Sequence, residues 1–259
     1  MTLPDFPAHL TPTLLQGRTA LVSGGVSGIG LAIAQLFEAS GAKVVVADIS
    51  LLGGEAPQSC PVGSGWHCDV SDEASVADLA KSVAKTGNGL DILVNCAGVP
   101  QSSTAIETMT VEAWDRIMNV NVRSLFLMTK HFLAPLKASG NGAIINICST
   151  VGVRPKAGLA AYSASKAAAI ATTQALALEL AKDRVRVNGI NPGATETPML
   201  SGFSHGREVQ EVVGSFASQI PMGEIIRPSD VAGAALYLAS DLARLVTGVT
   251  INVDGGRTV

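Results

Sequence analysis

The segment SGGVSGIG, residues 23–30, lies between the apolar run Thr19–Ser23 and an alanine-rich stretch of helical composition. Glycines at such a junction permit a tight turn and let the backbone approach a pyrophosphate at the N-terminus of the helix. A glycine cluster alone also marks ordinary turns, so its position between a strand and a helix is the informative feature. We therefore interpret residues 23–30 as a dinucleotide-binding turn.

Strand-like and helix-like stretches alternate along the chain around this turn. Continuous apolar runs such as Val44–Val46 are typical of strands buried on both faces. The alternation predicts an α/β fold, a doubly wound parallel sheet of about seven strands with helices on both faces. The predicted strands are Thr19–Ser23, Lys43–Asp48, Trp66–Val70, Leu90–Asn95, Ala143–Cys148, Val185–Ile190 and Val249–Val253.

The domain organisation follows from where this alternation holds. Residues 1–17 contain three prolines and no periodicity, which predicts a loose N-terminal arm. Residues 18–259 show no composition shift or repeat, which predicts one catalytic domain. Residues 194–221 are rich in Gly, Ser and Pro, and we expect them to form an irregular lid over the substrate.

Charge and cysteine content exclude several classes of protein. A net charge of −3 and a pI of 5.8 give no electrostatic footprint for nucleic acid or an anionic membrane. No apolar run has the length of a membrane span and the N-terminus lacks signal-peptide features, so we expect a cytoplasmic protein. The cysteines form no Cys-x-x-Cys pair and the histidines do not cluster, so no metal site is expected.

An acidic residue ends the second predicted strand. Asp48 lies near the distance from the glycine turn that is typical of the carboxylate holding the adenosine ribose. Such a carboxylate accepts hydrogen bonds from the ribose hydroxyls and repels a 2′-phosphate. The glycine turn also contains no Arg or Lys that would attract a phosphate. Both features favour NAD over NADP, although Asp48 could alternatively be an ordinary turn residue.

The run AYSASK, residues 161–166, places a phenol and an ammonium on one helix face. Tyr162 and Lys166 are four residues apart, so both side chains reach the same space. A phenol ionises near pH 10 in water, and a neighbouring cation favours its phenolate. The pair could thus transfer a proton. Taken alone, it is equally consistent with a half-buried aromatic residue and a solvated lysine.

Three motifs occur together and in order: the glycines of residues 23–30, Asn95–Gly98, and Tyr162-x-x-x-Lys166. Together they resemble the short-chain dehydrogenase/reductase family, from Arg18 to Gly256. The resemblance implies a Rossmann-like domain that transfers hydride between a nicotinamide cofactor and an alcohol or carbonyl group. It also implies a homotetramer or a dimer, and the apolar helices expected at about 111–137 and 160–181 would suit an interface.

The resemblance assigns four catalytic positions. Tyr162 corresponds to the general acid or base, and Lys166 to the residue that stabilises its phenolate and binds the nicotinamide ribose. Ser149 corresponds to the hydroxyl that hydrogen-bonds the substrate oxygen. Asn121 corresponds to the asparagine that holds a water in a proton relay behind the lysine.

The resemblance also implies a set of cofactor contacts. Asp69–Val70 would meet the adenine, and one or both of Thr195 and Thr197 would bind the carboxamide. Cys96 departs from the family, which more often has a second asparagine there. The implied cofactor-binding residues are Gly24, Ser27, Gly28, Ile29, Gly30, Asp48, Ile49, Asp69, Val70, Asn95, Ala97, Gly98, Tyr162, Lys166, Pro192, Gly193, Thr195 and Thr197.

Substrate contacts are expected from the variable loops around these positions. Their composition suggests an apolar or cyclic substrate, with Arg154 and His205 either meeting a polar end or lying exposed on the surface. The predicted pocket residues are Val99, Thr150, Val153, Arg154, Met199 and Phe203.

Three functions stay open on the sequence. The leading one is an NAD-dependent secondary-alcohol dehydrogenase or ketone reductase. A 3-oxoacyl-thioester reductase would prefer NADPH and a cationic surface for an acidic carrier protein, which Asp48 and the net charge disfavour. A catalytically silent NAD-binding sensor or scaffold would not need Asn121, Ser149, Tyr162 and Lys166.

Overall fold

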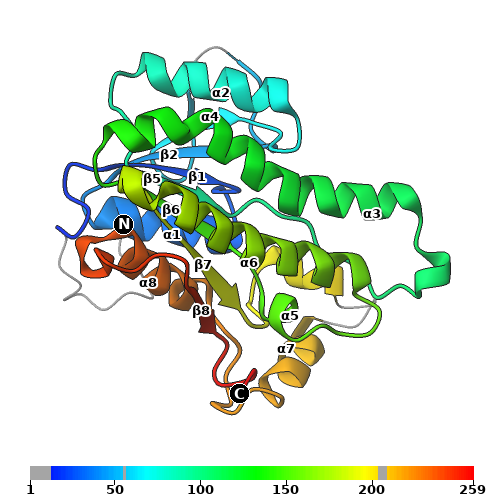
Figure 1. Ribbon diagram of the computed structural model, residues 1–259. Helices are drawn as coiled ribbons and strands as arrows, with labels where there is room; N and C mark the ends of the chain where they lie inside the picture. Colours follow the sequence, from blue (N-terminus) through cyan, green and yellow to red (C-terminus); the bar gives the residue numbers. More distant parts are fainter. Residues whose placement is uncertain (1–12, 55–56, 204–208) are drawn as a thin grey trace.

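The computed structural model describes residues 13–54, 57–203 and 209–259, and these form one sheet of eight strands with helices on both faces (Figure 1). The strand order is β3-β4-β2-β1-β5-β6-β7-β8, and every neighbouring pair is parallel except β3 and β4. The strands are β1 Thr19–Ser23, β2 Lys43–Asp48, β3 Gln58–Ser59, β4 Ser64–His67, β5 Ile92–Asn95, β6 Ala143–Ile147, β7 Arg186–Pro192 and β8 Thr250–Val253.

The predicted doubly wound α/β fold is confirmed, with one strand more than expected. The additional strand, β3, is a polar pair of residues at the sheet edge, too short to give a hydrophobic pattern. The third predicted strand, Trp66–Val70, is shifted in the structure to Ser64–His67, and Cys68–Val70 leave the sheet. Those three residues are therefore available to a site at the strand end.

Helices cover the two faces of the sheet in separate layers. One layer holds α1 Gly28–Ala39 and α8 Pro228–Ala239, which pack against each other; the other holds α2 Glu73–Lys85, α4 Ser124–Ala138 and α6 Ala160–Leu180 (Figure 1). Side chains alternate between the layers along each strand. In β2, Val44 and Val46 belong to the core beneath α1 and α8, whereas Val45 and Ala47 belong to the opposite core. Burial on both faces explains the continuous apolar runs in the sequence.

Shorter helical segments complete the fold. Residues 111–138 form α3 Val111–Met118, a π-helical turn η2 Asn119–Arg123 and then α4, in place of one regular helix. The remaining segments are η1 Ile106–Thr108, α5 Thr150–Val153, η3 Ala181–Asp183, η4 Pro198–Phe203, α7 Val209–Ala217 and η5 Asp241–Ala243.

Two predictions about irregular segments need correction. Leu15, within the predicted loose arm, is fully buried, and its N–H donates to the Ser40 carbonyl oxygen at 2.9 Å, so residues 13–17 are fixed to the domain. Residues 1–12 lie outside the described residues. The predicted irregular lid contains helix α7, whose apolar residues recur at helical spacing. His205 and the rest of residues 204–208 lie outside the described part of the chain.

The order of the strands sets where a ligand can bind. The chain passes from β1 to β2 on one side and later to β5 on the other, so the direction of winding reverses beside β1. In open α/β sheets ligands bind in the crevice at the carboxyl ends of the strands at such a point. Among the helices of the described ranges, none is both long and apolar enough to cross a membrane.

Candidate active site

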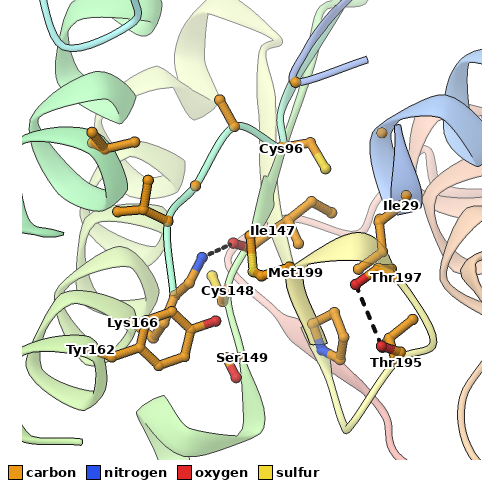
Figure 2. A pocket seen from close by; sticks show the side chains of 18 of the residues that line it. Ile29, Cys96, Ile147, Cys148, Ser149, Tyr162, Lys166, Thr195, Thr197 and Met199 are labelled. Carbon is orange, nitrogen blue, oxygen red and sulfur yellow. Dashed lines mark hydrogen bonds between the residues drawn. The ribbon is translucent and has the colours of Figure 1, made fainter. Parts of the chain in front are cut away.

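A cavity of about 630 Å³ opens at the carboxyl ends of the strands, and Figure 2 shows it from close by. It receives 21 of the predicted cofactor, catalytic and pocket residues: Gly24, Ser27, Gly28, Ile29, Gly30, Asp48, Ile49, Asp69, Val70, Ala97, Gly98, Val99, Ser149, Thr150, Tyr162, Lys166, Pro192, Gly193, Thr195, Thr197 and Met199. The volume lies within the usual range of sites for small molecules and cofactors. Motifs as far apart in the chain as residues 24–30 and 192–199 thus share one cavity.

The glycine turn is shaped by close backbone contacts. A Cβ on Gly30 would lie 2.1 Å from the Gly24 carbonyl oxygen, and one on Gly24, where φ is +67°, would lie 2.9 Å from the backbone of Ala97. Side chains at either position would therefore displace the turn. The turn leads into α1, where Ser27 makes no side-chain capping bond. Free N–H groups at the N-terminus of this helix can accept a pyrophosphate.

Asp48 is held at the end of β2 beside this turn. Its Oδ1 accepts hydrogen bonds from the Ser50 backbone N–H at 3.0 Å and from the Ser50 hydroxyl at 2.8 Å. The next residue, Ile49, is 63% exposed and lines the cavity. The carboxylate therefore has a fixed orientation at the cavity edge, as recognition of a ribose requires.

Asp69 and Val70 follow β4 at the same edge. The Asp69 Oδ1 accepts from the backbone N–H and the hydroxyl of Ser71, at 2.9 and 2.7 Å, and Val70 is buried. Burial raises the pKa of the adjacent Cys68 thiol to about 11. At Cys96, on the other side of β1, burial raises the thiol pKa to about 12. Both thiols are thus protonated and inert at neutral pH.

Tyr162 and Lys166 lie one turn apart on α6, and both are buried. The Lys166 Nζ lies 5.7 Å from the centre of the Tyr162 ring and donates to the Ile147 carbonyl oxygen at 2.8 Å. That carbonyl ends β6, so the ammonium is fixed to the sheet. Figure 2 shows the Tyr162 hydroxyl, the Lys166 ammonium and the Ser149 side chain gathered on one side of the cavity. A substrate oxygen between the two hydroxyls would meet a proton donor and a hydrogen-bond donor together.

Ser149 also caps a helix. It follows β6, and its Oγ accepts from the Val151 N–H at 3.3 Å as α5 begins. Thr150, beside it, donates its hydroxyl to the Pro192 carbonyl oxygen at 3.3 Å. The α5 segment thus fixes the Ser149 hydroxyl at the cavity and ties this corner to the end of β7.

Asn121 lies close to Gly98 and Lys166 and does not line the cavity. It sits in the π-helical turn, where its Oδ1 accepts from the Val99 N–H at 2.8 Å and its Nδ2 donates to the Val99 carbonyl oxygen at 3.1 Å. A Cβ added to Gly98 would lie 3.3 Å from the Asn121 Oδ1 and 3.8 Å from the Lys166 Nζ. Asn121 therefore fixes the backbone of Gly98 and Val99, which follow β5 and pass close to Lys166.

Asn95, predicted to contact the cofactor, does not line the cavity. Its side chain is buried, and its Nδ2 donates to the Asn146 Oδ1 at 2.8 Å. Asn146 donates in turn to the Thr173 hydroxyl at 2.9 Å. Strand alternation turns this side chain toward α6, where it links β5, β6 and the helix. The cofactor contact at Asn95 stays a prediction.

The segment after β7 forms the wall opposite Tyr162. The Thr195 hydroxyl donates to the Gly193 carbonyl oxygen at 3.1 Å, and the Thr197 hydroxyl donates to the Thr195 carbonyl oxygen at 3.4 Å (Figure 2). The two threonines bring this wall to the glycine turn, since a Cβ on Gly28 would lie 3.2 Å from the Thr197 methyl carbon.

Fewer of the predicted substrate residues than of the predicted cofactor residues line the cavity. Val153 is 49% exposed, Arg154 is exposed, and neither lines the cavity, because α5 is a single turn that directs them outward. The side chain of Phe203 lies outside the described part of the structure. Val151, Leu200 and Phe216 belong to the loop and lid segments from which substrate contacts were expected, and they line the cavity. Three further lining residues were not predicted: Lys156, Leu159 and Arg257.

Two of the missed residues are cations that flank one aromatic ring. The Lys156 Nζ lies 5.8 Å and the Arg257 Cζ 5.5 Å from the centre of the Phe216 ring. Burial, and then the charge of Arg257, lower the pKa of Lys156; burial lowers the pKa of Arg257. The helical spacing of Phe216 was a usable signal, whereas nothing in the sequence around Lys156 marked it.

Gln101, which was not predicted, contacts the start of α6. The N-cap position of α6, Leu159, provides no side-chain acceptor. Instead the buried Gln101 accepts from the Tyr162 N–H at 2.8 Å through Oε1 and donates to the Gly158 carbonyl oxygen at 2.9 Å through Nε2. Gln101 therefore caps α6 from another loop and fixes the backbone of Tyr162.

Comparisons with known proteins agree with this geometry. Residues 24–258 match the family model described as Enoyl-(Acyl carrier protein) reductase. The chain is 40% identical over 250 residues to 4-formylbenzenesulfonate dehydrogenase TsaC1/TsaC2 of Comamonas testosteroni, covering 95% of this chain and 99% of that protein. It is 38% identical over 250 residues to 2,5-dichloro-2,5-cyclohexadiene-1,4-diol dehydrogenase LinX of Sphingobium indicum, covering 95% and 98% of the two chains.

A similar structure has also been solved with a cofactor. The 3-ketoacyl-(acyl-carrier-protein) reductase of Brucella melitensis, described as complexed with NADH, superposes with a TM-score of 0.84 and 38% identity. The match covers 95% of this chain and all of that one. The likeness therefore extends over the whole sheet and both helical layers.

Proposed function

Because the chain belongs to the short-chain dehydrogenase/reductase family, we propose that it is an oxidoreductase that interconverts a cyclic secondary alcohol and its ketone with NAD. The observation that carries the proposal is the convergence of Tyr162, Lys166 and Ser149 on a cavity whose other end is the glycine turn and Asp48. The diol substrate named for the LinX relative, and the NADH named for the similar reductase, support the same chemistry.

The cofactor end of the cavity fits a dinucleotide. Gly24 and Gly30 let the backbone of the turn pack closely, since a Cβ at either would meet backbone within 3 Å, and the N–H groups at the start of α1 suit a pyrophosphate. Asp48 would accept hydrogen bonds from the adenosine ribose, Asp69 and Val70 would contact the adenine, and Thr195 or Thr197 would bind the carboxamide. Bound nicotinamide supplies a two-electron acceptor or donor of hydride.

The residues of the chain would supply orientation and proton transfer. In oxidation, the Tyr162 phenolate would take the proton of the alcohol group whose carbon gives up a hydride. In reduction, the Tyr162 hydroxyl returns a proton to the oxygen that receives electron density. Lys166 stabilises the phenolate by its charge and binds the nicotinamide ribose. Ser149 donates to the substrate oxygen as charge develops on it.

Asn121 and Gln101 would support this chemistry without meeting the substrate. Asn121 holds the Val99 backbone through two hydrogen bonds and lies next to Gly98, which is also close to Lys166. In this position it would keep the proton path between Lys166 and solvent in order. Gln101 would fix the position of the Tyr162 backbone, and with it the position of the phenol in the cavity.

The proposal is tested by NADH absorbance with a panel of cyclic and open-chain secondary alcohols and ketones. We expect turnover with NAD that exceeds turnover with NADP and disappears in Tyr162→Phe. A preference for NADP together with 3-oxoacyl thioesters would favour the thioester reductase instead. Tight NAD binding without turnover of any member would favour a sensor or scaffold.

The quaternary structure and the location belong to the same proposal. Phe126 on α4 is 57% exposed and Leu178 on α6 is 84% exposed, so both helices carry apolar side chains on their outer surface. Such side chains suit the interfaces of a homotetramer or a dimer. We propose this assembly in the cytoplasm. Size-exclusion chromatography with light scattering would measure its mass.

A further inference from the structure

The substrate end of the cavity carries a positive charge that the proposed reaction does not use. The acidic lining residues among those described, Asp48 and Asp69, both lie at the strand ends assigned to the adenosine. Lys156 precedes the catalytic helix, and Arg257 follows β8, so the two cations reach the other end from different parts of the chain. The lining carboxylates are thus confined to the adenosine end, whereas Lys156 and Arg257 lie at the other end; Arg116 of α3 and Lys166 are the further lining cations.

The neighbouring side chains that the structure describes hold these cations in place without neutralising them by direct contact. The Arg257 Nη2 donates to the Gln219 Oε1, an uncharged acceptor, at 2.5 Å. Asp254 attracts Arg257 from a distance, yet its carboxylate oxygens accept from the N–H groups of Gly256 and Thr258 and from the Thr258 hydroxyl. Within the described residues, neither Lys156 nor Arg257 forms an ion pair within 4 Å.

The ring of Phe216 fixes the arrangement of the charges. Both cations lie within 6 Å of its centre, close enough for each to be attracted to a ring face. The two like charges also repel each other, which contributes to the lowered pKa of Lys156. An anion bound at this end would relieve that repulsion, and the ring and Leu159 would contact an apolar body next to it.

We infer that the substrate carries an anionic substituent, a carboxylate or a sulfonate, that binds to Lys156 and Arg257. This inference rests on the proposed function. The apolar ring of the substrate then lies along Leu159, Phe216 and Met199, and its hydroxyl or carbonyl group lies at Tyr162 and Ser149. Charge at one end and chemistry at the other would fix both the orientation of the ring and the carbon that loses hydride.

Binding without turnover tests the inference directly. The protein loaded with NADH is titrated by calorimetry with cyclohexanecarboxylate, with benzenesulfonate and with the neutral cyclohexanecarboxamide. We expect the two anions to bind about tenfold or more tightly than the amide, since hydrogen bonds to charged groups are stronger than neutral ones. Raising the salt concentration should reduce this preference. Equal affinity for anions and amide would overturn the inference.

Variants locate the effect. Arg257→Gln should weaken anion binding about tenfold. Lys156→Gln should weaken it about threefold to tenfold, because the Lys156 side chain is more exposed than that of Arg257. In both variants the affinity for the amide and for NADH should be unchanged. Arg154→Gln is the matched control, because Arg154 is in the same loop as Lys156 but outside the cavity; it should change nothing. Equal losses in Arg154→Gln, or a loss of NADH affinity in the other two, would overturn the inference.

Turnover separates this inference from the proposed function. Hydroxycyclohexanecarboxylates substituted at positions 2, 3 and 4 are compared with the corresponding amides and with cyclohexanol. We expect kcat/KM to favour the acids about tenfold or more in the wild type and to lose that preference in Lys156→Gln and Arg257→Gln. Oxidation of cyclohexanol and the amides as efficiently as the acids would overturn the anionic substituent while leaving the dehydrogenase standing. Specific anion binding without any turnover would support the anion site and overturn the proposed dehydrogenase function.

Discussion

The two ends of the cavity are built by different means. The cofactor end is made of strand ends and of the turn that joins β1 to α1, so its side chains have little freedom once the sheet forms. The substrate end is made of the connection from α5 to α6, of α7 and of the turn after β8. These segments adjoin in space although they lie more than 30 residues apart in the chain.

This difference separates residues that the fold requires from residues that can be exchanged to suit another substrate. At the cofactor end a change of one atom meets backbone, as at Gly30. At the substrate end Lys156 and Arg257 meet solvent and an aromatic ring, so other side chains would fit there without moving the sheet. Substitutions at the cofactor end should therefore distort the fold, whereas substitutions at the substrate end should change substrate specificity.

Tyr162→Phe should have the largest effect, because it removes the proton-transferring group where the two ends meet. We expect kcat to fall by about 10²- to 10⁴-fold, the usual contribution of general acid or base catalysis. Affinity for NADH should stay within about threefold, because the ring remains in place. Stopped-flow absorbance and NADH fluorescence measure the two quantities. A variant that retains a tenth of wild-type activity would remove Tyr162 from its proposed role.

Gly30→Ala should damage the cofactor end through sterics alone. The added Cβ would lie 2.1 Å from the Gly24 carbonyl oxygen, so the turn must move. Overpacking of this kind costs about 1–3 kcal/mol, and we expect NADH affinity to fall about tenfold to a hundredfold. Fluorescence titration and thermal unfolding would record both effects.

Gly233→Ala is the matched control for that change. Gly233 lies within α8, and a Cβ there would meet no atom within 4 Å. Replacing a glycine in a helix interior should stabilise the fold by about 0.5–1 kcal/mol and leave NADH affinity unchanged. A loss of NADH affinity in this control would mean that the turn is not the origin of the effect.

Asp48→Asn should alter cofactor choice and loosen a single long contact with the turn, the 3.5 Å hydrogen bond that the Asp48 Oδ2 accepts from the Val26 N–H. The amide retains the size of the carboxylate and keeps an oxygen for Ser50, but it no longer repels a 2′-phosphate. We expect the ratio of kcat/KM for NAD to that for NADP to fall about tenfold or more. Asp115→Asn, on α3 outside the cavity, serves as the control. An unchanged ratio would contradict the role proposed for Asp48.

The same contrast explains how far the sequence could predict the structure. The glycine turn, Asp48 and the Tyr162–Lys166 pair were predictable because close backbone contact and helical spacing restrict which residues can stand there. Asn95 was assigned to the cofactor because it belongs, with Ala97 and Gly98, to the motif that resembles the family. Its orientation depends on strand alternation at the last residue of β5, and that boundary cannot be fixed to one residue from sequence.

The substrate end could not be predicted for a different reason. Arg154 and Lys156 are two residues apart, and only the short turn of α5 decides which of them faces the cavity. Arg257 reaches the site from the far end of the chain, and Phe216 does so through α7. Such proximity depends on tertiary packing, and no local pattern encodes it.

Gln101→Leu should show how the loop end supports the catalytic helix. Leucine removes the acceptor for the Tyr162 N–H and leaves that buried donor unpaired. We expect kcat to fall about threefold to tenfold with little change in the KM for NAD. Gln101→Glu keeps an acceptor oxygen and should recover part of kcat. If the pH profile of kcat keeps its shape in both variants, Gln101 acts on stability alone.

The smallest expected effect concerns the thiols at the cofactor end. Burial raises the pKa of Cys96 to about 12 and that of Cys68 to about 11, both above the ordinary value near 9. Below pH 9 the thiols are protonated in the folded and unfolded chains alike. Above pH 9 the unfolded chain releases protons that the folded chain retains, so the free energy of unfolding falls as the pH rises.

Cys96→Ala isolates this contribution from the other groups that titrate in alkali. Between pH 9 and 10 the free energy of unfolding should fall by up to about 1 kcal/mol more in the wild type than in Cys96→Ala. Cys60→Ala, next to the edge strand β3 and outside the cavity, is the control in the same urea titrations. If Cys96→Ala and the wild type keep the same pH dependence, the thiol is in contact with solvent. The cofactor end would then be an open and adaptable surface like the substrate end, and the contrast between them would fail.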